Sequence, residues 1–217
     1  MPPIVSVVGK SKSGKTTLIE KLVGELKSRG YRVATIKHAA QGLNFDKPDK
    51  DSWRHLQAGS EATAITSQDK VVLIKPMATA VTLDEIARLF GDDYDIILTE
   101  GFKQDKAPKI EVHRKEVGPL LGNIKKLIAI VTDEPLKTKT KQFSHQDVKG
   151  LADLLEEDFI KPQRERLSLY INNAPITLST FPKKTIGNVL VAMVSCLKGV
   201  PEVRSLEIFL RRQSKQG

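Results

Sequence analysis

The segment Gly9-x₄-Gly14-Lys15-Thr16 has the residue types and spacing of a phosphate-binding loop. Glycine lets backbone N–H groups turn inward toward anionic oxygens, and the N-terminus of a following helix adds to that attraction. Lys15 would place a positive charge at the β- and γ-phosphates, and the Thr16 hydroxyl would ligate Mg²⁺. Solvated loop positions are the alternative for Lys10 and Lys12. The predicted nucleotide-binding residues are Gly9, Lys10, Ser11, Lys12, Ser13, Gly14, Lys15, Thr16 and Thr17.

A carboxylate at the end of a neighbouring strand is the usual partner of such a loop, because Mg²⁺ or its water shell needs oxygen ligands. Glu100 directly follows the apolar run 94–99, at the edge where open α/β sheets bind ligands. Asp51 is a second candidate. The alternative for Glu100 is an exposed carboxylate without a metal. The predicted metal ligands are therefore Thr16, Asp51 and Glu100.

Three further residues near this edge are candidates for contact with a second substrate. Lys37 and His38 follow the predicted strand 31–36, and Arg54 stands three residues after Asp51. A phosphate clamp is one interpretation of Arg54, and a surface ion pair is the other. No residue is evident as the base for rapid hydrolysis, so the catalytic group is left unassigned.

The elements that must position these residues alternate between strand and helix along residues 1–160. Such alternation predicts an α/β fold like that of P-loop NTPases, with a mainly parallel sheet flanked by helices. Ser144 and Asp147 resemble a capping box at a helix start, and Thr82 is a candidate N-cap. The predicted strands are 4–8, 31–36, 62–66, 71–75, 94–99 and 127–131, and the predicted helices are 17–26, 51–59, 82–90 and 144–160.

A second pattern begins near Lys161-Pro162, which divides the chain into a nucleotide-binding domain, 1–160, and a small module, 161–217. Alternating apolar residues around Asn172-Asn173 predict a hairpin, and a helix and a last strand follow to give a β-β-α-β module. Cys196 falls within that apolar helix and is expected to pack in the core of the module. The predicted helix is 183–198 and the predicted last strand is 205–210.

The charge of the chain is concentrated in this module. Residues 161–217 contain 10 basic and 3 acidic residues, so 10 − 3 = +7 of the overall +9 lies there. A basic tail can meet nucleic acid, an acidic protein or a phosphorylated ligand, or it can serve solubility alone. The sequence lacks the aromatic–basic interleaving of single-strand binders, which disfavours nucleic acid.

The remaining composition favours the cytoplasm. A single cysteine excludes an internal disulfide framework and any multi-cysteine metal site. No apolar run approaches the ~18 residues of a membrane span, and no secretory signal precedes the first motif. We therefore expect a cytoplasmic protein without a membrane segment.

At four segments the sequence resembles the molybdopterin-guanine dinucleotide biosynthesis adapter protein (MobB) family, and the resemblance covers about residues 3–160. The Glu-Gly-Phe-Lys and Pro-Lys-Ile-Glu segments are more selective than the phosphate loop. The matching segments are Val7-Val8-Gly9 through Thr17-Leu18; Thr35-Ile36-Lys37-His38; Lys50-Asp51-Ser52-Trp53-Arg54 with Ala58-Gly59; and Leu98-Thr99-Glu100-Gly101-Phe102-Lys103 with Pro108-Lys109-Ile110-Glu111-Val112.

The resemblance implies a dimeric protein that binds GTP with Mg²⁺, hydrolyses it slowly and assists a separate guanylyltransferase, which joins GMP to molybdopterin. Molybdopterin itself is a further ligand that the resemblance raises. Lys15 and Thr16 would bind phosphate and Mg²⁺, and Glu100 and Asp51 would belong to the metal shell. The guanine-reading Asn-Lys-x-Asp motif is absent. Asp133, after a predicted strand, is the candidate to accept hydrogen bonds from guanine N1–H and N2–H₂.

Three other functions stay open at this point. A P-loop kinase for a small metabolite would use His38 or Asp51 to orient the acceptor, but its arginines are scattered. A metal-delivery GTPase usually carries Cys or His clusters, which one Cys and four dispersed His do not supply. Nucleic-acid binding by the tail would require a steep salt dependence.

Overall fold

The computed structural model describes residues 1–39, 50–77, 79–163, 166–172, 174–200, 202–203 and 205–210. It separates into two compact units, Met1–Arg164 and Glu165–Gly217. Because these units are not placed relative to one another, each is described by itself.

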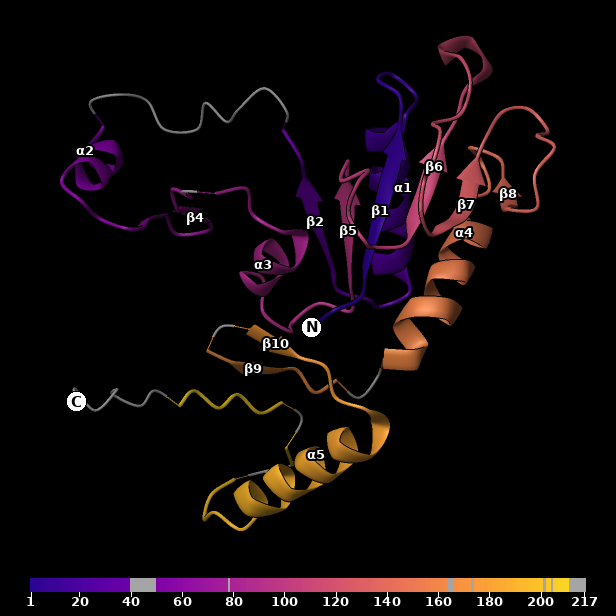
Figure 1. The fold of residues 1–217 in the computed structure, drawn as a ribbon. Coiled ribbons are helices and arrows are strands. Elements are labelled where there is room, and N and C mark those ends of the chain that lie inside the picture. Colours follow the sequence, from indigo (N-terminus) through magenta and orange to yellow (C-terminus); the bar gives the residue numbers. More distant parts are fainter. Residues whose placement is uncertain are drawn as a thin grey trace. The chain divides into compact units, whose positions relative to one another are not determined.

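Six strands of the first unit form one parallel sheet in the order β2-β5-β1-β6-β7-β8 (Figure 1). The carboxyl ends of parallel strands meet at one edge, which lies at the top of Figure 1. This arrangement confirms the expected α/β fold with a mainly parallel sheet. The bounds are β1 Ile4–Gly9, β2 Val33–Lys37, β5 Ile96–Glu100, β6 Lys109–Val112, β7 Leu127–Val131 and β8 Lys141–Phe143.

Helices cover both faces of this sheet because successive strand residues point to opposite sides. Leu98 belongs to a core that includes buried residues of α1 (Lys15–Ser28) and α4 (Val148–Leu155). Its neighbour Ile97 belongs to a second core with α3 (Leu83–Arg88). The sheet is thus the middle layer, and its first strand–helix junction carries the phosphate loop.

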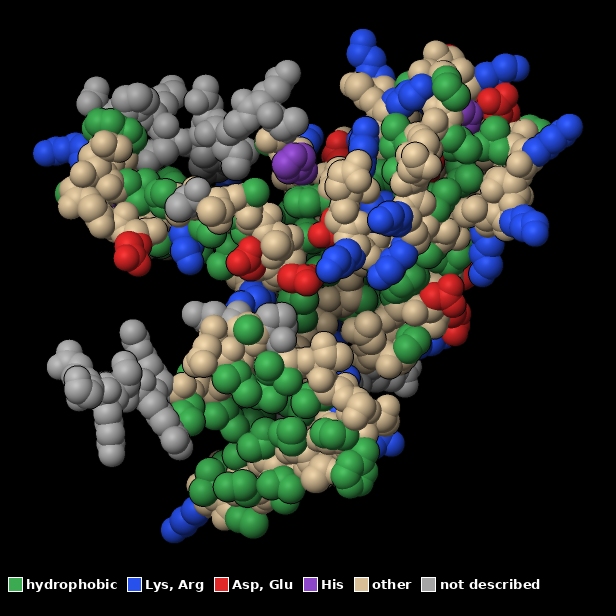
Figure 2. Space-filling model, viewed as in Figure 1, with side chains coloured by type: hydrophobic (Ala, Val, Ile, Leu, Met, Phe, Trp, Pro, Cys, Tyr) green, Lys and Arg blue, Asp and Glu red, His purple; other side chains and the backbone are tan. Residues whose placement is uncertain are grey.

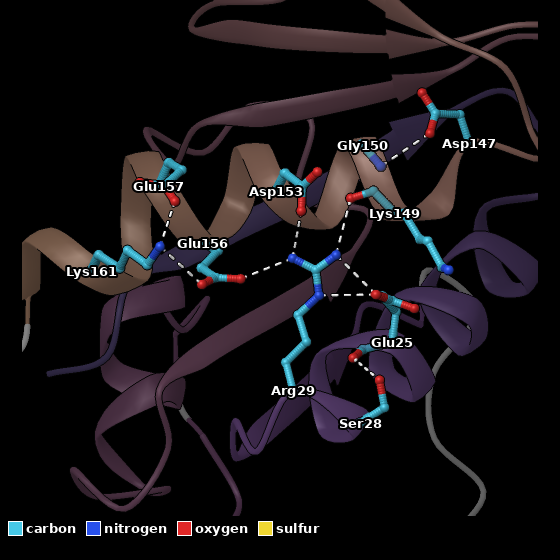
Figure 3. Close-up of polar contacts among 10 residues, drawn as sticks. All are labelled: Glu25, Ser28, Arg29, Asp147, Lys149, Gly150, Asp153, Glu156, Glu157 and Lys161. Atoms are coloured by element: carbon cyan, nitrogen blue, oxygen red, sulfur yellow. Dashed lines mark hydrogen bonds and ion pairs between the residues drawn. The ribbon is translucent and has the colours of Figure 1, made fainter.

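An arginine at the end of α1 ties the two helices of one face together (Figure 3). Arg29 makes ion pairs of 2.6 Å with Asp153, 2.8 Å with Glu156 and 2.9 Å with Glu25. Hydrogen bonds from Arg29 and Lys161 lower the pKa of Glu156 to about 2, and those from Glu156, Asp153 and Glu25 raise the pKa of Arg29. The network therefore holds α4 against α1.

The helix starts were predicted with mixed success. Thr82 caps α3 as expected, and its side chain accepts a hydrogen bond from the Glu85 amide. The expected start at Ser144 is wrong, because Asp147 is the N-cap of α4 and accepts from the Gly150 amide. A carboxylate three residues before a helical N–H satisfies that donor directly, so the helix begins one residue after Asp147.

A hairpin lies outside the main sheet. β3 (Thr63–Thr66) pairs antiparallel with β4 (Val71–Ile74), and the two form a sheet of their own. The short helix α2 (Asp51–Gln57) precedes them and has no buried residue. Other short elements are the 3₁₀ helix Lys115–Val117, the π-helical turn Glu156–Ile160 and the 3₁₀ helix Lys161–Gln163.

The second unit contains the predicted hairpin and helix but not the last strand. β9 (Leu169–Ile171) pairs antiparallel with β10 (Ala174–Ile176), and α5 (Thr180–Ser195) follows. Residues 205–210 form no strand, because alternation alone supplies no neighbouring strand to bond with. Cys196, expected in a core, is exposed.

Apolar side chains of this unit gather on the surface over α5 (Figure 2). Phe181, Val189, Met193 and Leu197 are exposed, and no described residue of the unit is buried. Among the described residues of the whole chain, no helix combines the length and apolar character needed to cross a bilayer.

Candidate functional site

The phosphate loop joins the end of β1 to the start of α1, as the sequence predicts. Gly9 has a φ of +151°, and a β-carbon there would lie 2.5 Å from the Val112 carbonyl oxygen and 2.7 Å from Ser13 Oγ. Gly14 has a φ of +97° and forms the N-cap of α1. Both positions therefore need glycine, for close approach at Gly9 and for a left-handed backbone at both.

Lys15 points back across this loop. Its Nζ donates a 2.6 Å hydrogen bond to the Lys10 carbonyl. Burial lowers the pKa of Lys15, Glu100 opposes that change, and the positive charges of Lys103 and Lys37 add to it. The ammonium group thus lies among other cations, where an anionic ligand would be strongly favoured.

The remaining loop residues divide by exposure. Ser11 and Lys12 are exposed at the tip, and Thr17 is exposed at the start of α1. Ser13 is buried, and its Oγ has no hydrogen-bond partner among the described atoms. The loop accordingly presents its backbone and Lys15 to a ligand, while Ser13 belongs to its base.

The Thr16 hydroxyl donates a 2.9 Å hydrogen bond to Glu100 Oε2. The contact follows from the sheet, since β5 pairs with β1 and places Glu100 beside Val7. Lys37 Nζ lies 3.8 Å from the same carboxylate. A hydroxyl and a carboxylate oxygen side by side are ligands that suit Mg²⁺, so this pair fits the predicted metal site.

His38 lies at the same rim of the sheet. Its amide donates to the Glu100 carbonyl at 3.0 Å, and its ring lies 5.2 Å from that of Phe102. Gly101 has a φ of +102°, and a β-carbon there would come within 3.2 Å of His38. The structure therefore brings Lys37 and His38 together with Glu100.

The structure does not bring the candidates on α2 into this group. Asp51 and Arg54 are exposed, and no bond between described residues joins either to Thr16 or Glu100. Figure 1 shows α2 away from β1. Their roles stay predictions.

β6 holds several loops of the site, although it was not predicted as a strand. Lys109 is fully buried, and its Nζ donates to the carbonyls of Asp105 and Ala107 at 2.5 and 2.9 Å. Glu111 is buried, and its Oε1 accepts from the Leu121 amide at 2.5 Å, while Oε2 has no hydrogen-bond partner among the residues that the structure describes. Burial lowers the pKa of Lys109 and raises that of Glu111. Lys109 thus fixes the segment that leads into β6, and Glu111 fixes the loop that follows it.

The chain just beyond β6 is fixed in the same way. His113 Nε2 lies 3.0 Å from Glu134 Oε1, and His145 Nε2 lies 3.0 Å from the His113 carbonyl. The Lys115 amide donates to Asp133 Oδ1 at 3.1 Å. That bond lowers the pKa of the exposed Asp133, which keeps the carboxylate ionised. Asp133, the candidate for guanine, therefore lies beside the segment that follows β6.

Arg114 completes this arrangement, and sequence reasoning missed it. Its Nε donates to the Ser13 carbonyl at 3.3 Å. Nε and Nη2 would lie 3.6 and 3.7 Å from a β-carbon on Gly14. The signal that could have found it is the alternation of charged and apolar residues from Lys109 to His113, which is typical of a strand that ends beside a loop.

Comparison with known proteins adds a family. The model described as molybdopterin guanine dinucleotide synthesis protein B matches residues 4–133, which include the phosphate loop, Glu100 and Asp133. A Haemophilus influenzae molybdopterin-guanine dinucleotide biosynthesis adapter protein is 36% identical over 156 residues, covering 71% of this chain and 88% of the relative.

Two further relatives extend the comparison. A Methanocaldococcus jannaschii protein described as a "putative molybdopterin-guanine dinucleotide biosynthesis adapter protein" is 24% identical, and the match covers 94% of this chain and 96% of the relative, so it extends into the second unit. The crystal structure of a MobB homologue from Bacillus stearothermophilus has a TM-score of 0.54 at 26% identity, with 74% and 99% of the two chains covered.

Proposed function

The chain belongs to the molybdopterin guanine dinucleotide synthesis protein B (MobB) family, and on that premise we propose that it binds GTP with Mg²⁺ and serves as an adapter in molybdopterin guanine dinucleotide biosynthesis. The observation that carries the nucleotide site is the 2.9 Å contact between Thr16 and Glu100 at the phosphate loop. This contact supports the proposal because a nucleotide-bound Mg²⁺ needs oxygen ligands such as a hydroxyl and a carboxylate.

The chain's own residues would divide the binding as follows. Backbone N–H groups of the loop and the N-terminus of α1 hold the phosphate oxygens, and Lys15 neutralises the β- and γ-phosphates. Thr16 and Glu100 hold Mg²⁺, which when bound offsets the charge of the phosphates, and Asp51 is a further candidate ligand. Asp133, exposed and ionised, accepts from the N–H edge of guanine.

The adapter role concerns what happens to the bound nucleotide. Among the described residues, the charged groups that act on Lys15 are Glu100, Lys103 and Lys37, and none of these three is an evident base for rapid hydrolysis. We therefore assign slow GTP hydrolysis and assistance to a guanylyltransferase in the cytoplasm. Lys37, His38 and Arg54 are the candidates for contact with molybdopterin, and residues 161–217 form a basic module that is separate from the domain 1–160.

A homodimer is part of the proposal. β3 and β4 form a two-stranded sheet whose outer face carries Val71, 73% exposed, and Leu73, 50% exposed. Isolated two-stranded sheets are marginal in water, and open strand edges are templates for pairing with another chain. The hairpin of a second copy would cover both the exposed apolar face and the open strand edges.

The test is guanylyltransferase activity with and without this protein. The purified transferase is supplied with molybdopterin and Mg-GTP, and molybdopterin guanine dinucleotide is measured by chromatography. We expect wild-type protein to increase product formation and the Lys15→Ala variant not to. Equal stimulation by both proteins would contradict the proposal. Transfer of labelled phosphate to a small acceptor without the transferase would instead favour the kinase.

A further inference from the structure

Arg114 is a large cation at the phosphate loop to which neither the motif nor the family comparison gives a role. Its guanidinium runs along the loop at Ser13 and Gly14, where Nε donates to the Ser13 carbonyl. Its backbone is held on both sides, because the His113 carbonyl contacts His145 and the Lys115 amide contacts Asp133. The side chain is therefore presented from a fixed segment.

The sheet order says which end of a nucleotide would lie near this arginine. The metal pair Thr16–Glu100 lies on the β5 side of β1, and Arg114 and Asp133 follow β6 and β7 on the opposite side. In a magnesium nucleoside triphosphate the metal binds the β- and γ-phosphates, away from the nucleoside. A metal on the β5 side therefore directs the nucleoside toward β6 and β7.

We propose that the guanidinium of Arg114 packs against the face of the bound nucleobase and thereby positions it beside Asp133. A planar guanidinium stacks well on aromatic rings. The guanidinium of Arg114 already contacts the phosphate loop at Ser13, and the next residue, Lys115, is bonded to Asp133 through its amide. This inference rests on the proposed function, and it assigns Arg114 to the nucleoside rather than to the phosphates.

Two ligands separate these assignments. Calorimetric titrations of the full chain compare Mg-GTP with Mg-tripolyphosphate, which offers the same phosphate chain without a nucleoside. For Arg114→Gln we expect GTP affinity to fall roughly tenfold, from the loss of a cation–π contact. We expect the affinity for tripolyphosphate to change no more than in the control.

The matched control is Lys115→Gln, which removes a positive charge from the neighbouring residue, whose side chain is 79% exposed. Its effect on both ligands measures the electrostatic background. Parallel losses for GTP and tripolyphosphate in Arg114→Gln would overturn the inference, because they would make Arg114 a phosphate or loop residue. Wild-type protein that binds neither ligand would overturn the proposed function itself.

Discussion

The Thr16 hydroxyl donates a 2.9 Å hydrogen bond to Glu100 Oε2, although 84 residues separate the two in the chain. Thr16 belongs to the first turn of α1 and Glu100 ends β5, so the contact joins the phosphate loop to the strand beside it. The pair is the centre of the proposed Mg²⁺ site.

Replacing Glu100 with glutamine should weaken metal binding selectively. The amide oxygen of Glu100→Gln still accepts from Thr16, but the negative charge that favours Mg²⁺ is lost. We expect the Mg²⁺ requirement for GTP binding to shift to about tenfold to a hundredfold higher concentration, measured by titrating Mg²⁺ at fixed GTP. Glu61→Gln, at an exposed position before β3, is the control and should bind as wild type. An unchanged Mg²⁺ requirement in Glu100→Gln would remove Glu100 from the metal site.

The buried carboxyl of Glu111 should be a source of pH-dependent instability. Burial raises its pKa in the folded protein, so its contribution is most favourable at low pH and is lost as the pH rises through the unfolded and then the folded pKa. Glu111→Gln keeps an acceptor for the Leu121 amide but cannot ionise. We expect a higher denaturation midpoint than wild type at pH 7 and a smaller difference near pH 4.

Glu111→Ala separates the charge from the hydrogen bond. It removes the carboxyl but leaves the Leu121 amide without its acceptor, which should cost about 1–3 kcal/mol of unfolding free energy. Urea denaturation of both variants measures this. If both variants were equally more stable than wild type at pH 7, the hydrogen bond from the Leu121 amide would contribute nothing to the free energy of unfolding.

The Arg29 network should fail in acid. Ion pairing lowers the pKa of Glu156 from 4.5 to about 2, so its stabilising effect is present above the unfolded value and is lost as the pH falls toward 2. We expect the melting temperature of wild type to drop over this window and that of Glu156→Gln to drop less. Calorimetry from pH 5 to pH 2 provides the comparison. Identical pH profiles would exclude a role for the Arg29–Glu156 pair.

The hairpin prediction concerns the oligomeric state. Leu73→Lys places a charge on the exposed face of β4. In a dimer that pairs these faces, this charge would be buried against the second protomer. We expect light scattering to report a dimer for wild type and a monomer for the variant. Gln68→Lys adds the same charge in the turn between β3 and β4 and should leave the dimer intact. A dimeric Leu73→Lys protein would place the interface elsewhere.

The phosphate loop was predictable because its residues are contiguous and their types are dictated by phosphate chemistry. The position of Glu100 was predictable for a related reason, since an apolar run that ends on a carboxylate marks the end of β5. Both inferences need only the local sequence and the rule that parallel strands end at one edge.

The role of β6 was not predictable in that way. Lys109 and Glu111 are charged, but both are buried because backbone groups of the flanking loops satisfy them, the Asp105 and Ala107 carbonyls and the Leu121 amide. Nothing in a charged alternating segment shows that its partners are loop backbone atoms. Arg114 was missed with the strand that positions it.

The most direct test of the account is the affinity of Lys15→Ala for Mg-GTP, measured by calorimetry beside wild type. Lys15 supplies the one side-chain ammonium that the motif directs at the phosphates, so its removal should weaken binding at least about tenfold while circular dichroism shows an intact fold. Undiminished affinity of a folded Lys15→Ala protein would contradict a nucleotide site at this loop.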